Sequence, residues 1–387
     1  YDGIIDGLIG TGTKGAPRSP YADIIQEVNR SKRPIISIDI PSGLDPDTGQ
    51  LHDSCMKATR TVALAFLKRG LTQYPGLDAV GEVIVRTIGI WPSFADQFGI
   101  RTFLLSKTFL EEHFADSTDQ PRQNNSHKGT YGHVLVCAGS QEMSGAGLLC
   151  SKAALRTGSG LVTWAVPESL VPSLMGLVPE VMLKGLAGKT HSLNSVEELL
   201  AVLTTRNIAV IGPGLGRFAD DSRWLRTIWE QSSCPLVLDA DALNMIADTA
   251  DFAEWSLRSH PTILTPHPGE MARLLGVTTA EIQRNRIEIA RSFAARHRVI
   301  LVLKGARTVI ATPDGAAYIN PTGNPGMATG GSGDVLAGII AGFIAQGLSA
   351  DHAACFGVWL HGYAGDQAAS KRKSPNSLIA GDIINEL

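Results

Sequence analysis

The residue whose type and position most clearly suggest catalytic chemistry is Asp334, which ends a glycine-rich stretch. The glycines that precede it are Gly323, Gly326, Gly330, Gly331 and Gly333. Bare backbone N–H groups and the start of a helix favour a bound phosphate. A carboxylate beside that phosphate and a substrate hydroxyl can act as a general base. We therefore predict phosphoryl-transfer chemistry with Asp334 as the catalytic residue. The alternative is a flexible turn with Asp334 as a helix N-cap, although a cap does not require five glycines.

A cationic turn lies shortly before this loop. Lys304, Gly305, Ala306, Arg307 and Thr308 follow the apolar run 299–303 directly. A lysine and an arginine around a glycine turn suit the phosphate tail of a nucleotide. Taken alone, the turn could equally be a solvated surface loop, but the glycine loop about 30 residues later favours nucleotide binding.

Two further loops are ambiguous. His267 lies between two prolines, which stiffen the backbone, so its ring could donate a hydrogen bond to a substrate or could be structural. The run Gly212-Pro-Gly-Leu-Gly216 allows close approach of a ligand, or makes a tight turn.

Near the N-terminus, Asp6 and Asp39 lie in or near apolar strands, where a carboxylate is costly unless it is paired or binds a cation. The glycine turn 10–16 continues into Pro17 and Pro20 instead of a helix. The dinucleotide fingerprint is therefore incomplete, which disfavours a hydride-transferring enzyme.

The candidate site residues stand in polar or glycine loops that follow short apolar strands, so we expect these strands to position them. We expect strands at 3–9, 34–40, 61–66, 80–85, 133–137, 161–166, 208–211, 236–238, 262–264 and 299–303, and helices at 21–29, 145–157 and 335–347. This alternation predicts an α/β fold with doubly wound parallel sheets and with the site at the carboxyl ends of the strands.

The length of 387 residues predicts two domains, and the pattern changes near residue 99. A net charge of −3 gives no basis for a nucleic-acid partner, and no apolar run is long enough for a membrane span. Five scattered cysteines favour a reducing compartment, which we take to be the cytoplasm. Because Tyr1 falls in mid-strand, we expect the chain to be a fragment.

Six motifs in order carry a resemblance to a known family. They are His127-Lys-Gly-Thr-Tyr-Gly132, Ile211-Gly-Pro-Gly-Leu215, Leu238-Asp-Ala-Asp-Ala-Leu243, Thr265-Pro-His-Pro-Gly-Glu270, Leu303-Lys-Gly305 and Asn324-Pro-Gly-Met-Ala-Thr-Gly-Gly-Ser-Gly-Asp334. The sequence resembles the ADP- or ATP-dependent NAD(P)H-hydrate dehydratases of the ribokinase-like superfamily over residues 99–387. Residues 1–98 resemble the C-terminal portion of a Rossmann-like NAD(P)H-hydrate epimerase domain.

The resemblance implies a role for individual residues. Ala146, Gly214, His267 and Asp334 would contact the hydrated coenzyme, while Lys304, Gly305, Ala306, Arg307, Thr308 and Gly333 would hold the adenine nucleotide. In the epimerase portion, Gly10, Thr11, Gly12, Thr13, Lys14, Gly15, Ala16 and Asp39 would touch the substrate, and Asp6 and Ser42 would ligate potassium. The family's upstream Asn-Gly-Gly-Asp segment does not occur here, so we expect an incomplete and inactive epimerase portion.

The implied activity is nicotinamide nucleotide repair: ADP-dependent dehydration of (S)-NAD(P)H hydrate, with AMP and phosphate as products and Mg²⁺ and K⁺ as cofactors. We also expect a homo-oligomer. One alternative is a ribokinase-superfamily kinase of a small vitamin-precursor alcohol, which would release a stable phosphorylated product. Another is a nucleotide-binding regulatory protein without turnover.

Overall fold

The computed structural model describes residues 2–12, 15–114, 122–249 and 251–387. The chain forms two compact units. Unit 1 comprises Tyr1–Thr102 with Arg284–Ile287, and unit 2 comprises Phe103–Gln283 with Glu288–Leu387. Each of the two sheets is rich in parallel pairs, as expected for an α/β chain.

Unit 1 contains a four-stranded parallel sheet in the order β1-β2-β3-β4. Its strands are β1 (Ile4–Asp6), β2 (Ile35–Ile38), β3 (Arg60–Leu64) and β4 (Glu82–Arg86), with helices α1 (Tyr21–Arg30) and α2 (Ser93–Gln97). Ile25 of α1 is fully buried in one cluster with Ile35 and Met56, because the apolar side chains of α1 lie on one helix face.

Unit 2 contains a ten-stranded sheet in the order β5-β14-β13-β12-β11-β10-β9-β6-β7-β8. The parallel strands are β6 (His133–Cys137), β7 (Leu161–Pro167), β8 (Met182–Leu186), β9 (Ile208–Ile211), β10 (Leu236–Leu238), β11 (Thr262–Leu264) and β12 (Ile300–Leu303). Strands β13 (Val309–Ala311) and β14 (Ala317–Ile319) continue antiparallel, and β5 (Thr102–Leu104) is the edge strand beside β14.

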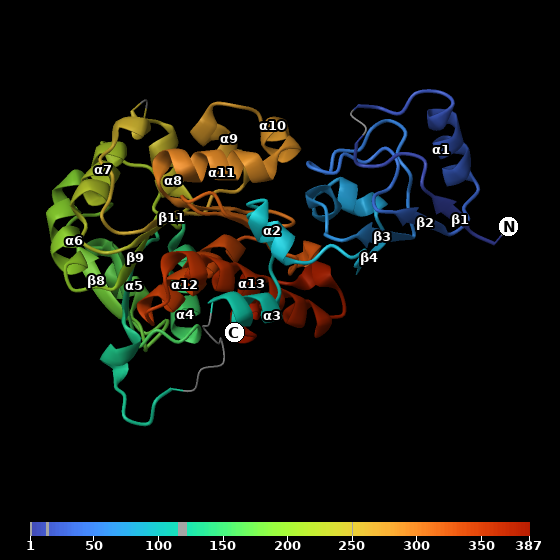
Figure 1. Ribbon diagram of the computed structural model, residues 1–387. Helices are drawn as coiled ribbons and strands as arrows, with labels where there is room; N and C mark the ends of the chain where they lie inside the picture. The colour runs from blue at the N-terminus through green and yellow to red at the C-terminus, as the bar shows by residue number, and fades with distance from the viewer. Residues whose placement is uncertain (1, 13–14, 115–121, 250) are drawn as a thin grey trace. The chain divides into compact units, whose positions relative to one another are not determined.

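Helices lie on both faces of this sheet. Figure 1 shows α4 (Ser144–Arg156), α12 (Ser332–Ala345) and α13 (Ala350–Ser370) on one side of the strands, and α7 (Asp221–Gln231), α8 (Asp241–Ala247), α9 (Pro268–Leu275) and α11 (Arg286–His297) on the other. The remaining helices of the described chain are α3 (Lys107–Phe114), α5 (Val171–Leu174), α6 (Val196–Leu203), α10 (Thr279–Arg284) and α14 (Ala380–Asn385). The predicted doubly wound arrangement is confirmed.

Helix α12 is the centre of the core and also carries the glycine loop at its N-terminus. Every residue from Val335 to Ala345 is buried. Two glycines allow α4 to approach closely: a Cβ at Gly338 would lie 2.2 Å from the carbonyl oxygen of Cys150, and one at Gly342 would lie 2.8 Å from Cβ of Thr157. The start of α12 is therefore fixed by a rigid, tightly packed helix pair. Among the described residues, none of the helices combines the length and apolar character needed to cross a lipid bilayer.

Candidate active site

The charged loops of unit 2 meet at the carboxyl ends of its parallel strands. Asp239 follows β10 and Lys304 follows β12, and their side chains form an ion pair with 2.6 Å between Lys304 Nζ and Asp239 Oδ1. The Asp239 side chain is only 1% exposed and that of Lys304 is 17% exposed. Because burial weakens solvent screening, this pair strongly orients the lysine.

The glycine loop lies directly against this ion pair. A Cβ built on Gly333 would lie 3.3 Å from Lys304 Nζ and 3.6 Å from Asp239 Oδ2. A larger residue at this position would push on the pair. The structure thus brings together the cationic turn and the glycine loop, which the sequence predicts to share one ligand.

Asp334 lies in the first turn of α12, inside the helix. The N-cap is Gly331, with a φ of 88°, so the alternative that Asp334 caps the helix is wrong. Burial, together with the nearby carboxylate of Asp239, raises the pKa of Asp334 to about 7, although Lys304 acts in the opposite direction. A carboxylate with a pKa near neutrality is well suited to accept and release a proton.

Lys304 is surrounded by more negative charge than it can neutralise. Its Nζ also lies 3.9 Å from Oε2 of Glu270. Burial alone lowers the pKa of Lys304, but the carboxylates of Asp239 and Glu270 raise it above its ordinary value. Burial raises the pKa of Glu270 to about 7. Neither Asp239 nor Glu270 was assigned a role from the sequence, although Asp239 directly follows β10 and Glu270 lies in the first turn of α9, the helix after β11.

His267 is the N-cap of α9. Its Nδ1 accepts hydrogen bonds from the backbone N–H groups of Gly269, at 2.9 Å, and Glu270, at 3.2 Å. Since Nδ1 is an acceptor, the proton of the neutral ring is on Nε2. Burial and the nearby Lys304 lower the pKa of His267, and its side chain is 56% exposed. The ring therefore has a structural role at Nδ1 and offers a donor at Nε2.

Gly214 and Ala146, both expected to contact the coenzyme, also lie side by side, the first in a loop after β9 and the second in the first turn of α4. Gly214 has a φ of 60°, and a Cβ built there would lie 2.8 Å from Cβ of Ala146 and 2.7 Å from the carbonyl oxygen of Met143. The backbone N–H of Gly216 donates to Oδ2 of Asp241, at 2.9 Å. Asp241 is one of the acids that raise the pKa of Asp334, which links this loop to the same charged group.

The rest of the cationic turn is more open. Gly305 and Ala306 are exposed, while Arg307 and Thr308 are half-buried. Gly305 has a φ of 132° and Arg307 a φ of 59°, and the Thr308 hydroxyl donates to the Gly305 carbonyl oxygen at 3.0 Å. This geometry leaves the backbone of the turn accessible to a ligand.

A second polar group lies in unit 1, at the ends of β1 and β2. The buried carboxylate of Asp6 accepts hydrogen bonds from the Ser42 hydroxyl (2.6 Å), the Ser42 backbone N–H (2.9 Å), the Ser37 hydroxyl (2.8 Å) and the Leu8 backbone N–H (3.3 Å). These four donors match the four acceptor positions of a carboxylate. In this arrangement Asp6 and Ser42 do not fit a bound potassium ion.

Asp39 has a φ of 69°, a conformation that is strained for a residue other than glycine. Its carboxylate accepts from the Leu64 backbone N–H at 3.0 Å and forms an ion pair with Lys68. Gly10, Thr11, Gly12, Gly15 and Ala16 form an exposed segment, and Thr13 and Lys14 lie outside the described residues. Asp39 and Lys68 are thus tied to the end of β3.

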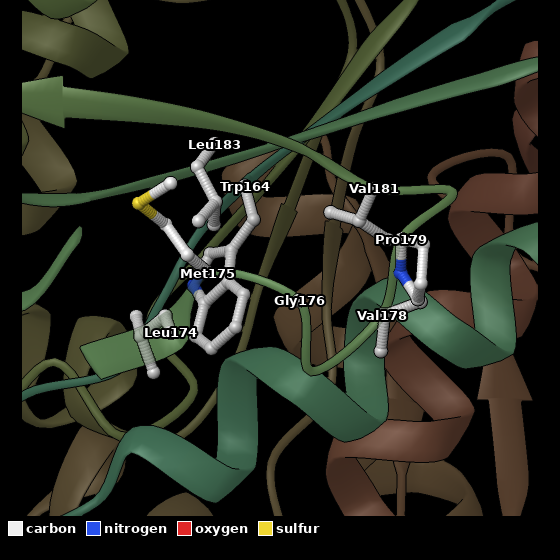
Figure 2. A pocket seen from close by; sticks show the side chains of 8 residues that line it. All are labelled: Trp164, Leu174, Met175, Gly176, Val178, Pro179, Val181 and Leu183. Atoms are coloured by element: carbon white, nitrogen blue, oxygen red, sulfur yellow. The ribbon is translucent and has the colours of Figure 1, made fainter. Parts of the chain in front are cut away.

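An apolar pocket of about 180 Å³ lies elsewhere in unit 2. Figure 2 shows the indole of Trp164 beside Leu174, Met175 and Leu183, with Val178, Pro179 and Val181 completing the lining. None of its lining residues is ionisable, so the pocket offers no acid–base chemistry. Within the described ranges, no three His, Cys, Asp or Glu side chains are grouped so as to hold a metal ion.

Comparisons with known proteins agree with this geometry. A family model described as NAD(P)H-hydrate dehydratase matches residues 134–386, and one described as YjeF-related protein N-terminus matches residues 1–70. The bifunctional NAD(P)H-hydrate repair enzyme Nnr of Moorella thermoacetica is 43% identical over 390 residues, which cover 100% of this chain and 72% of that protein. The chain belongs to the bifunctional NAD(P)H-hydrate repair enzyme family. The Escherichia coli member is 35% identical over 389 residues, covering 100% of this chain and 71% of its own length.

Solved structures identify the fold of unit 2 as ribokinase-like. The Bacillus subtilis ADP/ATP-dependent NAD(P)H-hydrate dehydratase, co-crystallized with ATP/Mg²⁺, is 32% identical with a TM-score of 0.64, covering 74% of this chain and 96% of that chain. A ribokinase-like superfamily protein from Enterococcus faecalis is 29% identical with a TM-score of 0.62, covering 74% and 94%. The resemblance found in the sequence is confirmed, and these relatives favour the repair enzyme over a vitamin-precursor kinase.

Proposed function

We propose that this chain repairs damaged nicotinamide coenzymes by dehydrating (S)-NAD(P)H hydrate, with ADP as the phosphoryl donor and AMP and phosphate as products. Residues 99–387 form the dehydratase domain, and residues 1–98 form a portion of the epimerase domain that interconverts the R and S hydrates. The observation that carries the proposal is the convergence of Asp334, Lys304 and the glycine loop at one sheet edge. A base, a cation and bare amides are what phosphoryl transfer to an alcohol requires.

The chemistry starts at the hydroxyl of the hydrated ring, which is a poor leaving group. Asp334 accepts the hydroxyl proton as the oxygen attacks the terminal phosphoryl group of ADP, and AMP departs. The backbone N–H groups at residues 330–333 stabilise the charge on the transferring group. The ring nitrogen lone pair then expels phosphate, which carries away the former hydroxyl oxygen. The iminium ring that results loses a proton from the adjacent ring carbon to water, and NAD(P)H is regenerated.

Binding is divided between the two sides of the site. Lys304, Arg307 and the amides of Gly305, Ala306, Thr308 and Gly333 hold the nucleotide phosphates. Ala146, Gly214 and His267 contact the hydrated coenzyme, with the Nε2–H of His267 as a hydrogen-bond donor. Asp334 lies where the two ligands meet.

The acidic surroundings of Lys304 fit a Mg²⁺ ion carried with the nucleotide. Mg²⁺ is commonly bound by one or two carboxylates together with substrate phosphates, and Asp239 and Asp334 are the carboxylates we assign to it. When bound, it neutralises charge on the phosphate oxygens. The hydrogen bonds that already occupy the Asp6 carboxylate give no support for a potassium ion at Asp6 and Ser42, and we assign no step of the reaction to potassium.

For unit 1 we propose that Asp39 and the segment at residues 10–16 touch the epimerase substrate, as the resemblance implies. We also propose a cytoplasmic location, since all five cysteines are buried free thiols, and a homo-oligomeric state, which sedimentation would test.

The test is an incubation of the purified chain with chemically prepared NAD(P)H hydrate and Mg²⁺, with or without ADP. The absorbance of the dihydronicotinamide ring should return only with ADP, and AMP and phosphate should form in equal amounts. Asp334→Asn should lower turnover ~10²- to 10⁴-fold, the usual loss when a general base is removed. A stable phosphorylated product without NAD(P)H would instead identify a kinase.

A further inference from the structure

The first half of the glycine loop is held by a residue of α13. Asp366 accepts a hydrogen bond from the backbone N–H of Gly323, at 2.9 Å to Oδ2, and from the side-chain amide of Asn324, at 2.8 Å to Oδ1. The two positions are separated by more than 40 residues of sequence. Each oxygen of the Asp366 carboxylate thus accepts a hydrogen bond from one of two adjacent loop residues. Hydrogen bonds to an ionised carboxylate are stronger than those between neutral groups.

These bonds also set the orientation of Asn324. Because a carboxylate only accepts, Asn324 must turn its NH₂ group toward Asp366 and its carbonyl oxygen away. That oxygen accepts from the backbone N–H of Gly326, at 3.0 Å, and so caps the 3₁₀ turn Pro325–Met327. One carboxylate on α13 therefore determines the path of the chain up to Met327.

Helix α13 contacts the loop at other points as well. The Thr322 hydroxyl donates to the Trp359 carbonyl oxygen at 3.0 Å, and the Ser332 hydroxyl lies 3.3 Å from Nε2 of His361. At Gly365 a Cβ would lie 2.3 Å from the sulfur of Met327, so the Met327 side chain packs directly against this glycine of α13. The loop is attached to α13 from its beginning to the start of α12.

We propose that Asp366 is a positioning residue for the phosphoryl-transfer step. Through Gly323 and Asn324 it holds the glycine loop so that the amides at 330–333 and Asp334 face the nucleotide. Asp366 itself touches neither ligand. This inference rests on the proposed function, because it names the residue that holds the glycine loop in the conformation that phosphoryl transfer requires.

The decisive variants exchange the two side chains that hydrogen-bond. Asp366→Asn replaces one of the two acceptor oxygens by an NH₂ group. Only one of the two loop donors, the Gly323 N–H or the Asn324 NH₂, then keeps an acceptor. The double variant Asp366→Asn with Asn324→Asp restores all three hydrogen bonds. The amide oxygen introduced at position 366 accepts from the Gly323 N–H, and the NH₂ group there donates to the carboxylate introduced at position 324. That carboxylate also accepts from the Gly326 N–H. Asp351→Asn is the matched control, because Asp351 lies on the same helix with a side chain that is 43% exposed.

Steady-state kinetics and amide hydrogen exchange separate positioning from a general loss of structure. Asp366→Asn should raise KM for ADP and lower kcat, with kcat/KM for ADP falling ~10²-fold, the loss that a displacement of about 1 Å can cause. KM for NAD(P)H hydrate should stay unchanged, and exchange should accelerate at 323–331 but not in α13. A purely structural role would reduce only the active fraction and leave both KM values alone.

The exchanged double variant should recover at least part of kcat/KM for ADP. Kinetics of Asp366→Asn equal to those of Asp351→Asn would overturn the proposal, and so would a folded double variant as slow as the single one. If neither variant with asparagine at 366 folds, Asn324→Ala carries the test, since it leaves α13 intact: normal KM for ADP in that variant would also overturn it. An inactive wild-type chain would reject the proposed function instead.

Discussion

The ionisation of Asp334 makes a quantitative prediction about pH. Burial and the neighbouring Asp239 raise its pKa to about 7, and a general base works only in its ionised form. The rate constant kcat/KM should therefore be constant above about pH 8 and fall tenfold for each pH unit well below 7. At pH 5 the enzyme should retain about 1% of its plateau activity, as a single ionisation near 7 requires. For an ordinary aspartate the same loss would occur only near pH 2.

The same shift predicts that the Asp334 carboxylate destabilises the fold at neutral and alkaline pH. The native pKa lies above that of the unfolded chain, so the native state binds the proton more tightly. The resulting stability is fully present below about pH 4 and is lost as pH rises through 7. A rise from the ordinary value of 3.8 to about 7 corresponds to at most roughly 4 kcal/mol. Asp334→Asn should therefore be more stable than the wild type by the full difference at pH 8, by a smaller difference at pH 5, and not at all below about pH 4.

Urea unfolding followed by tryptophan fluorescence measures this difference, with Asp351→Asn as the control that should match the wild type at each pH. Turnover of the same Asp334→Asn preparation, measured in parallel, should be lost at every pH. An acid limb of kcat/KM centred near pH 4 would refute the reasoning, and so would an Asp334→Asn variant that is less stable than the wild type at pH 8.

Three further predictions concern the surrounding groups. Lys304→Met should lower the free energy of unfolding by about 3–5 kcal/mol in urea titrations, because it leaves the buried Asp239 without its cation, and calorimetry should show no ADP binding. Gly214→Ala should raise KM for NAD(P)H hydrate but not for ADP, since the new methyl group would lie 2.8 Å from Cβ of Ala146; Gly276→Ala, with a similar φ of 66° but open space, should leave both unchanged. Finally, calorimetry should show tighter binding of ADP with Mg²⁺ than with a chelator, and equal affinities would contradict the Mg²⁺ assignment.

Much of the fold could be predicted because short buried strands end abruptly in polar loops. The expected bounds of 208–211, 236–238 and 262–264 coincide with β9, β10 and β11, since in each case a glycine, an aspartate or a Thr-Pro pair follows the apolar residues. The strands β13 and β14 were missed. Helix α13 was missed because glycines interrupt its apolar face where the loop and α12 pack closely.

The site was predictable only where one stretch of sequence carries several signals. Asp334 and Lys304 stand in loops with glycines and charges, and the structure brings these loops together. Asp239, Glu270 and Asp366 gave no such signal, because their roles depend on partners far away in the sequence: Lys304 is 65 residues from Asp239. A buried acid after a strand indicates that some partner exists, but only the fold identifies it.

The balance of charge explains why such partners are needed. One lysine faces the carboxylates of Asp239, Glu270 and Asp334, so the free site repels the phosphates that it must bind. Protonation of Glu270 and Asp334, whose pKa values are both raised to about 7, relieves part of this repulsion in the free enzyme. When a nucleotide arrives with its cation, a Mg²⁺ ion held beside Asp239 and Asp334 would favour ionised Asp334. At neutral pH a larger fraction of Asp334 would thus be ionised when nucleotide and cation are both present, which would couple proton abstraction to the binding of the phosphoryl donor.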